Sequence, residues 1–304
     1  MVQRTKDVEV LKEIARKVRI DLLNALHRAK SGHTGGSLSS VEILVTLYFS
    51  ELRHDPKNPR WEDRDRFVLS KGHGVPALYS VLAHAGYFSR QELITLRKPG
   101  SRLQGHPEYD LDIGIEASTG SLGHGLSAAN GMALAAKMDG KNIRVYVLLS
   151  DGELQEGATW EAITTSSYRK LDNLCAIVDR NRFQNDGAMA EIKDIEPVPD
   201  KWRAFGWEAE VLDGHDIAGL ISAFEKARQT KGKPFVIVAN TTKGKGVSIF
   251  ENKGHYHGVA PNDDEIKIAL SELLKDEESG LGLEKLAGKE LRLELDKLFG
   301  VSTI

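Results

Sequence analysis

Residues 143–157 read IRVYVLLSDGELQEG, and this stretch decides the fold class. Its first seven residues are β-branched or apolar almost without interruption, which is typical of a strand buried on both faces of a sheet. A turn containing Asp151 and Gly152 follows, and residues 158–170, ATWEAITTSSYRK, are predicted to form a helix. A buried strand that leads through a turn into a helix indicates an α/β fold.

The same alternation continues toward the C-terminus. Strands are predicted over 173–179 (NLCAIVD), 206–212 (GWEAEVL) and 234–240 (PFVIVAN), with a helix over 217–229 between the last two. Strands that alternate with helices predict a parallel sheet with helices on both faces.

Two helices are predicted near the N-terminus. Apolar residues recur at steps of three and four over several turns: Leu11, Ala15, Val18, Leu22 and Leu26. Gly32 follows a basic last turn and is predicted to cap this first helix. The second predicted helix lies within residues 40–52, SVEILVTLYFSEL.

No internal repeat or low-complexity linker divides the chain. We therefore expect one α/β domain over residues 1–261 and a helical C-terminal extension over 262–304. Residues 284–300, EKLAGKELRLELDKLFG, are either an interaction face or a solvated helical tail.

The bulk composition is ordinary for a soluble enzyme. The 304 residues are 40% apolar and 28% charged, with a net charge of -3, which gives no indication of nucleic acid or an anionic membrane as partner. The N-terminus lacks a signal peptide and no stretch approaches ~18 apolar residues, so a cytoplasmic protein is expected. The single cysteine, Cys175, is expected to be a buried structural thiol. The glycosylation sequon at Asn240 is interpreted as chance.

Two polar residues follow predicted strands. Asp151 comes directly after the strand of residues 143–149, and Asn181 follows the next strand. The carboxyl ends of parallel strands are where open α/β sheets bind ligands, and carboxylate and amide oxygens suit Mg²⁺. Asp-Gly and Asn are also ordinary turn residues, so spacing alone leaves both interpretations open. The common dinucleotide, P-loop and zinc motifs are absent from the sequence.

Histidines recur in glycine-containing loops. The loops are SGHTGG, KGHG, GHPE, GHG and HYHG, and their histidines are His33, His73, His106, His124 and His257. Imidazoles can hydrogen-bond hydroxyls and phosphates and transfer protons near neutral pH. Composition does not show whether these rings meet in space.

Taken together, these segments resemble a known family. SGHTGG, LSKGHG, LQGHPE, TGSLGHGLSAANGMALAAK, SDGELQEG, VDRNRFQNDG, TTKGKGVS and HYHG occur in the order seen in the amino-terminal half of transketolases. The resemblance covers about residues 10–260. It implies a thiamine-diphosphate-binding fold, thiamine diphosphate and Mg²⁺ as cofactors, and two-carbon ketol transfer between sugar phosphates of the pentose phosphate pathway (transketolase, EC 2.2.1.1).

The resemblance also implies roles for matched positions. The implied Mg²⁺ ligands are Asp151, Asn181 and the carbonyl of Phe183. The implied cofactor-binding residues are His73, Gly120, Ser121, Leu122, Gly152, Glu156, Asn181, Lys243 and His257. Among these, His73 and Lys243 match positions that bind the diphosphate, and Glu156 matches a supporting glutamate near a subunit interface. The implied catalytic residues, which line the substrate channel, are His33, His106 and His257.

Some positions depart from the family pattern. Ser150 stands where many relatives have glycine, and Thr34 and Ser121 replace frequent prolines. These changes leave the implied metal ligands intact, but they leave the identity of the sugar substrate undetermined.

Full transketolases continue into a pyrimidine-binding and a C-terminal domain, which we expect to be absent from this chain. The glutamate that activates the cofactor and the arginines that hold sugar phosphate are therefore expected on a second chain, in a heterotetramer of two copies of each.

Other functions remain open at this point. Within the cofactor class, a deoxyxylulose phosphate synthase, a ketoacid dehydrogenase component or a transketolase for an unusual sugar are alternatives; the first two fit the histidine pattern poorly. From a different class, the chain could be a non-catalytic module that binds cofactor and regulates a partner.

Overall fold

The computed structural model describes residues 4–274, 286–298 and 300. The helices are α1 (Val8–Ala29), α2 (Thr34–Leu38), α3 (Val41–Thr46), α4 (Val75–Ala85), α5 (His124–Met138), α6 (Gly157–Tyr168), α7 (Met189–Ile192), α8 (Val198–Ala204), α9 (Ile217–Gln229), α10 (Asp263–Leu273) and α12 (Gly288–Leu298). The strands are β1 (Arg66–Leu69), β2 (Val145–Ser150), β3 (Leu174–Arg180), β4 (Phe183–Gln184), β5 (Gly187–Ala188), β6 (Glu208–Asp213) and β7 (Phe235–Asn240).

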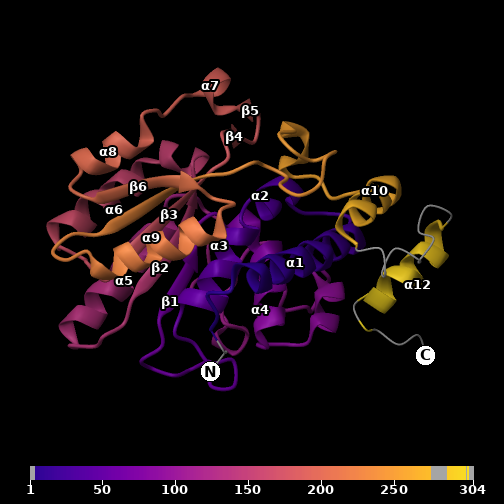
Figure 1. Cartoon of the computed structure of the whole chain (residues 1–304), viewed down its shortest axis with the longest axis horizontal. Helices are drawn as coiled ribbons and strands as arrows, with labels where there is room; N and C mark the ends of the chain where they lie inside the picture. Colours follow the sequence, from indigo (N-terminus) through magenta and orange to yellow (C-terminus); the bar gives the residue numbers. More distant parts are fainter. Residues whose placement is uncertain (1–3, 275–285, 299, 301–304) are drawn as a thin grey trace.

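Five strands form one parallel sheet in the order β1-β2-β3-β7-β6. Figure 1 shows this sheet between layers of helices, with the short β4–β5 hairpin beyond its edge. The predicted α/β fold is therefore confirmed. All strands of a parallel sheet end on the same edge, so the loops that follow β1, β2, β3 and β7 are brought together.

Side chains of the central strands alternate between two cores. Tyr146 and Leu148 of β2 face a cluster that includes α1, α3, α4 and α9. Val145 and Val147 of the same strand face a second cluster with α5, α6 and α8. All four side chains are fully buried, which explains why the strand carries apolar residues on both faces rather than alternating ones.

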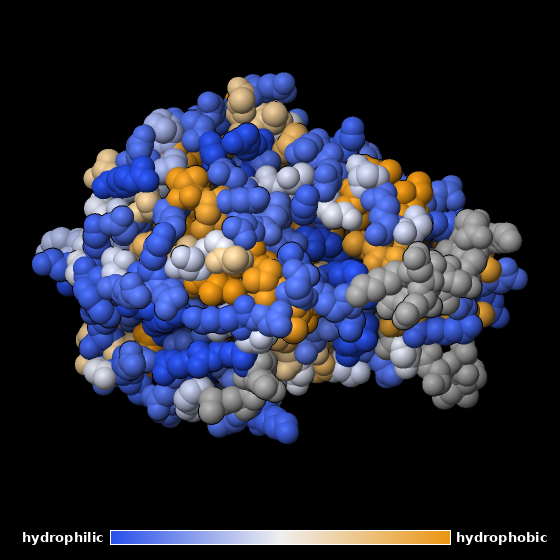
Figure 2. All heavy atoms as spheres, in the orientation of Figure 1, coloured by the Kyte–Doolittle hydropathy of each residue, from blue (hydrophilic) through white to orange (hydrophobic). Residues whose placement is uncertain are grey.

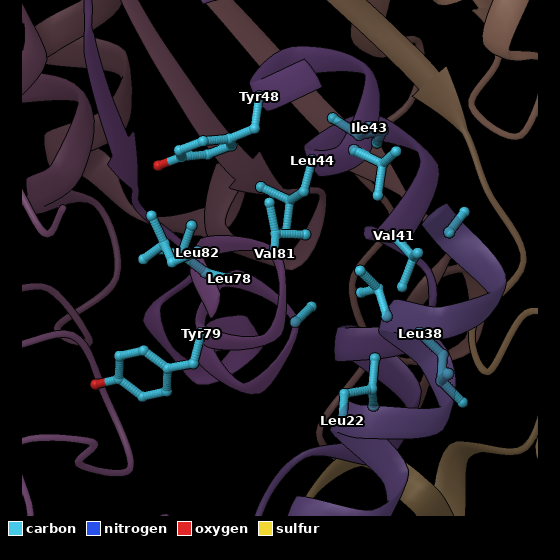
Figure 3. Packing of buried hydrophobic residues seen from close by; sticks show 14 of the residues in the cluster. Leu22, Leu38, Val41, Ile43, Leu44, Tyr48, Leu78, Tyr79, Val81 and Leu82 are labelled. Atoms are coloured by element: carbon cyan, nitrogen blue, oxygen red, sulfur yellow. The ribbon is translucent and has the colours of Figure 1, made fainter. Parts of the chain in front are cut away.

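The first core supports the N-terminal half of the molecule. Figure 3 shows Leu22 of α1 beside Leu38 of α2, with Val41 of α3 above them, while Leu44 of α3 lies next to Val81 of α4. Each of these side chains is at least 98% buried. This packing fixes the C-terminal end of α1, and hence the loop that follows it, against the sheet.

One strand was not predicted, and two predicted helices differ from expectation at their ends. Strand β1 was not predicted, because its four residues RFVL lie between charged segments and give too short an apolar run. Helix α1 is capped by Lys30 in the left-handed conformation (φ 50°), not by Gly32, because the helix ends at Ala29. The helix predicted within residues 40–52 is present, but its last turn, Leu47–Glu51, is a π-helix.

The described part of the C-terminal segment docks on the first core. Leu291 and Leu295 of α12 are buried, and the Leu295 carbonyl accepts a hydrogen bond of 2.9 Å from Asn24 Nδ2 on α1. The solvated-tail alternative is therefore wrong for this helix; residues 284, 285 and 299 of the predicted segment lie outside the described residues. Helix α10 begins at a capping box of Asn262 and Glu265. A domain boundary at residue 262 remains a prediction.

Two further features concern the surface and the thiol. No helix in the described ranges is long and apolar enough to cross a bilayer. Figure 2 shows a mostly hydrophilic face with hydrophobic residues exposed in separate patches, as is ordinary for a folded protein.

Cys175 is fully buried in β3, and this burial raises the pKa of its thiol to about 12.

Candidate cofactor and substrate site

Neighbouring strands each deliver a polar residue to the same edge of the sheet. Lys71 follows β1, Asp151 follows β2, Asn181 follows β3 and Lys243 follows β7. Beside them lies a pocket of about 200 Å³. Its lining residues are Gly36, His73, Leu122, Ser150, Gly152, Gln155, Glu156, Asn181, Phe183, Gln184, Asn185, Lys243 and His257.

Asp151 is a buried carboxylate held by backbone donors. Its side chain is almost fully buried, Oδ1 accepts from the Gly152 N–H at 2.9 Å, and Oδ2 accepts from the Arg182 N–H at 2.5 Å. Burial, together with the negative charge of Asp179, raises the pKa of Asp151 from 3.8 to about 7. A positive charge bound at this position would favour the ionised form.

Asn181 presents its amide next to this carboxylate. Its Oδ1 accepts from the Phe183 N–H at 3.0 Å, and its Nδ2 lies 3.3 Å from Asp179 Oδ2. These contacts orient the amide oxygen toward the turn that leads into β4.

The donor set fits a hard cation that is completed by ligand oxygens. No group of three His, Cys, Asp or Glu side chains in the described residues is arranged to hold a metal. A cation here would therefore depend on Asp151, an amide oxygen, a backbone carbonyl and oxygens of a bound diphosphate or water, which is the usual coordination of Mg²⁺. Gly152 leaves the pocket side open, since a Cβ placed on it would make only ordinary contacts, at 3.5 Å from Gln184 Cβ and 3.9 Å from Met189 Sδ.

An ion pair that the sequence analysis missed lies beneath the pocket. Lys71 and Asp179 are fully buried, and Lys71 Nζ donates to Asp179 Oδ2 and, at 2.8 Å, to the Gly36 carbonyl. Asp179 also accepts from Ser39 Oγ at 2.7 Å and from Thr241 Oγ1. Burial alone would raise the pKa of the Asp179 carboxyl, but the Lys71 ammonium and the other donors hold it below its ordinary value. This pair ties β1, β3, α2 and the loop after β7 together.

Four of the five loop histidines converge. The ring of His33 lies 5.2 Å from that of His73, 6.1 Å from that of His106 and 5.5 Å from that of His257, centroid to centroid. His73 and His257 stack at 5.3 Å. His124 is exposed at the start of α5, and among the described residues it has no ring contact with the other four. All five histidines lie in similar glycine-containing loops, so the sequence could not show that His124 lies apart from the other four.

The clustered histidines are neutral at physiological pH. Burial, followed by the charge of Lys243, lowers the pKa of His257 to about 3. Burial is also the main reason why the pKa of His33 falls to about 4, and it lowers the pKa values of His73 and His106. Lys243 Nζ donates to His257 Nδ1 at 2.9 Å, so the hydrogen of this ring lies on Nε2.

The pKa of Lys243 is shifted as well. Burial and the positive charge of Lys71 lower its pKa to about 8. Its side chain packs on Gly35, where an added Cβ would lie 2.8 Å from Lys243 Cγ. The ammonium is therefore charged at neutral pH and close to losing its proton just above it.

Glycines bring the loop of residues 119–122 against the histidines. A Cβ on Gly72 would lie 2.8 Å from the backbone nitrogen of Gly120, and a Cβ on Gly120 would lie 2.9 Å from His106 Cδ2. Gly120 also has φ 142°, which side chains rarely adopt. From this loop Leu122 reaches the pocket, whereas Ser121 is exposed beside it.

Thr34, which replaces a frequent proline, links two histidine segments. Its Oγ1 donates to the Val259 carbonyl at 2.6 Å, so the segment after His33 is joined to the segment after His257. Proline has no hydroxyl to make this bond.

A second missed group supports the loop that carries Lys243. The Thr242 N–H donates to His215 Nε2 at 2.8 Å, and His215 Nδ1 is 2.9 Å from Glu42 Oε2. Arg19 Nη2 donates to the same carboxylate at 2.8 Å, and Arg19 Nε donates to the Lys245 carbonyl at 3.0 Å. These residues are far apart in sequence, so no motif could reveal them.

A polar pocket at the carboxyl edge of a parallel sheet defines an α/β ligand-binding domain. The family described as "Transketolase, thiamine diphosphate binding domain" matches residues 10–279. The chain therefore belongs to the transketolase family.

Similar proteins include short and long chains. The 6-deoxy-6-sulfo-D-fructose transketolase subunit SqwG of Clostridium sp. (strain MSTE9) is 45% identical over 276 residues, covering 91% of this chain and 99% of that one. An apulose-4-phosphate transketolase subunit of Actinobacillus succinogenes is 46% identical over 88% of this chain and 95% of its own. Human transketolase is 44% identical over 83% of this chain, but the match covers only 40% of the human protein. The structure of transketolase from Campylobacter jejuni superposes with a TM-score of 0.84 at 31% identity, covering 97% of this chain and 46% of that one.

Proposed function

We propose that this chain is the diphosphate-binding subunit of a split transketolase (EC 2.2.1.1), which transfers a two-carbon ketol unit from a ketose phosphate to an aldose phosphate using thiamine diphosphate and Mg²⁺. The observation that carries the proposal is the convergence of a buried carboxylate, Asp151, with Asn181, Lys243 and the four neutral histidines at one edge of the sheet. Two relatives that match over nearly their whole length are named as subunits, which supports the need for a second chain.

The cofactor roles follow from the charges and the open backbone. Asp151, Asn181 Oδ1 and the Phe183 carbonyl would hold Mg²⁺. Lys243 and His73 would bind the diphosphate, with the Gly152 backbone against it. Thiamine diphosphate, when bound, supplies the carbon nucleophile that this chain lacks. The loop of Gly120, Ser121 and Leu122 would pack against the cofactor, and His257 borders both the cofactor and the sugar.

The histidine roles follow from their neutral state. The ring of His257 can donate from Nε2, because Nδ1 is occupied by Lys243. His33 Nδ1 is buried and has no hydrogen-bond partner among the described residues, so this ring has hydrogen-bonding capacity that the described residues do not satisfy. Together with His106, these rings would orient the hydroxyls near the reacting carbons and move protons to and from them.

The partner would complete the site from the open side. His106 and Glu156 are both exposed at the site, where a second chain can reach them. That chain would bring the glutamate that activates the cofactor, in a heterotetramer of two copies of each chain. We place this enzyme in the cytoplasm and in pentose phosphate metabolism. A transketolase for an unusual sugar is the second candidate, since the names of two relatives specify a sulfofructose and apulose 4-phosphate.

Reconstitution tests the proposal. Transfer from xylulose 5-phosphate to ribose 5-phosphate would be measured with thiamine diphosphate and Mg²⁺, for the chain alone and for the complex recovered from its native extract. Activity of the complex alone is the expected result. If the complex binds cofactor but transfers no ketol unit from this donor, 6-deoxy-6-sulfofructose or apulose 4-phosphate, the proposed function is wrong and a non-catalytic module is favoured.

A His106→Ala substitution is expected to lower kcat/KM for ketose by about 100-fold in the assembled enzyme, as is typical for loss of a proton-transferring residue. Binding of Mg²⁺ and thiamine diphosphate should change little, because His106 does not line the pocket beside Asp151. His255→Ala is the matched control, since the ring of His255 contacts only Tyr256 among the described aromatic rings. Equal ketose turnover in the His106 variant would contradict the role.

The affinity for thiamine diphosphate is expected to fall as pH rises above about 8, the pKa to which burial and Lys71 lower Lys243. A bound diphosphate stabilises the ammonium, so the pKa is higher in the complex and binding takes up a proton. The affinity then falls by up to about tenfold per pH unit above 8. Equilibrium binding at saturating Mg²⁺ between about pH 8 and 9.5, above the pKa of about 7 of Asp151, measures this fall. Lys243→Arg, which stays charged, should give a flat profile, and a wild-type profile equally flat would refute the assignment.

A further inference from the structure

A buried carboxylate that the proposed function does not use lies two residues after Asp151. Glu153 has no exposed surface. Its Oε1 accepts a hydrogen bond from Ser70 Oγ and one of 2.9 Å from the Gly123 N–H, and its Oε2 accepts from the Ser150 N–H at 3.3 Å. All three groups donate, so both oxygens act as acceptors, as the oxygens of an ionised carboxylate do.

On one side, Glu153 closes the turn that carries Asp151. The Glu153 N–H donates to Ser150 Oγ at 3.2 Å, while the Ser150 N–H donates back to the carboxylate. This reciprocal pair has the pattern of a capping box, and it encloses Asp151 and Gly152. Ser150 is one of the positions that depart from the family pattern, and the glycine of that pattern has no hydroxyl to accept this bond. The serine therefore gives the turn a contact that glycine cannot make.

On the other side, Glu153 holds the end of the loop of residues 119–122. Gly123 follows this loop and is the N-cap of α5. A carboxylate that accepts the N–H of an N-cap also lies at the positive end of the helix dipole. The loop starts at Thr119, whose Oγ1 donates to the Leu69 carbonyl at 2.6 Å. Both ends of the loop are therefore tied to the end of β1 or to the residue that follows it, the second end through Glu153.

We propose that Glu153 is a positioning residue, which holds the turn of Asp151 and the loop of residues 119–122 as one unit for the binding of Mg²⁺ and thiamine diphosphate. This inference rests on the proposed function, because it concerns the same cofactor site. Glu153 itself does not line the pocket, so it acts through the segments that it joins. Its contacts with the turn and with the loop are separate, so the two can be tested apart.

Three substitutions separate the two contacts in the assembled enzyme. Ser150→Ala removes the hydroxyl on the turn and should weaken Mg²⁺ binding at saturating thiamine diphosphate by about threefold to tenfold, the usual effect of one hydrogen bond. Ser70→Ala removes the hydroxyl beside the loop and should weaken thiamine diphosphate binding at saturating Mg²⁺ by a similar factor. Glu153→Gln should weaken both, because its single oxygen cannot accept from both backbone N–H groups.

Hydrogen exchange in the cofactor-free chain gives a readout that needs no ligand. At least one of the Ser150 and Gly123 amides should exchange faster in Glu153→Gln, and the Glu153 amide should exchange faster in Ser150→Ala. Glu191→Gln makes the same change on an exposed carboxylate and should leave exchange and both affinities unchanged.

Thermal melting of each variant distinguishes positioning from a general effect on the fold. Both affinities falling together in all three variants, in proportion to the loss of thermal stability, would mean that Glu153 only stabilises the fold. Affinities within about twofold of wild type in all three variants would also overturn the proposal.

The binding measurements separate this inference from the proposed function. If wild type binds Mg²⁺ and thiamine diphosphate but transfers no ketol unit, the proposed function fails, and different losses in Ser150→Ala and Ser70→Ala still support the positioning role. If wild type transfers ketol units but the variants bind both cofactors as wild type does, the proposed function is supported and the positioning role is overturned.

Discussion

An Asp151→Asn variant of the assembled enzyme is expected to lose at least about 100-fold in affinity for thiamine diphosphate with Mg²⁺, and with it nearly all ketol transfer. Asp151 is a buried carboxylate whose oxygens accept hydrogen bonds only from backbone N–H groups among the described residues, whereas Asp179 is already paired with Lys71. Asparagine has the same size but no charge for the metal. The loss is measured by titrating Mg²⁺ at a fixed concentration of thiamine diphosphate and following the quenching of protein fluorescence by the bound cofactor.

Controls distinguish a lost ligand from a damaged fold. The amide of asparagine could turn a donor toward the backbone N–H of Gly152 or Arg182, so thermal melting of the variant must accompany the binding measurement. Asp186→Asn is the matched substitution, because Asp186 is exposed in the same segment and, among the described residues, accepts a side-chain hydrogen bond only from the neighbouring Asn185. An affinity within about threefold of wild type in Asp151→Asn would remove Asp151 from the metal site.

Lys71→Met is expected to lower the free energy of unfolding by about 3–5 kcal/mol, the usual cost of breaking a buried ion pair by removing one partner. The change leaves the Asp179 carboxylate fully buried without its ammonium, and it removes the donor to the Gly36 carbonyl. Urea denaturation of the isolated chain measures the loss.

A double variant isolates the cause. Lys71→Met with Asp179→Asn removes both charges and should recover part of the stability lost in the single variant. Lys253→Met changes an exposed lysine and should shift the free energy of unfolding by less than about 0.5 kcal/mol. A loss below about 1 kcal/mol for Lys71→Met would show that this pair does not hold the loops together.

The parts of the fold that local pattern determines could be predicted from the sequence. The strands around residues 145 and 174 are buried on both faces and give long apolar runs, and α9 spans Ile217–Gln229 as its periodicity predicts. Strand β1 could not be found, because four residues give no usable pattern and its place in the sheet is fixed by pairing with β2. The sequence could not decide between docking of α12 and a solvated tail, since the docking depends on Asn24 of α1, which is remote in sequence.

The site divides in the same way. Asp151 and Asn181 could be proposed because each follows a recognisable strand, and strand ends of a parallel sheet share one edge. Lys71 and Asp179 could not, because their importance depends on the ion pair that they form once β1 and β3 are brought together by folding. The histidines could be proposed as a group, but only the packing of their loops separates His33, His73, His106 and His257 from His124.

The position of the single cysteine has a practical consequence. Cys175 is sealed inside β3 and its thiol pKa is raised to about 12, so it will not react with maleimide reagents in the folded protein. A cysteine introduced at an exposed position such as Tyr168 on α6 would therefore be the only reactive thiol on this chain. Spin labels or fluorophores attached there could measure spacings within an assembly without removing the native cysteine.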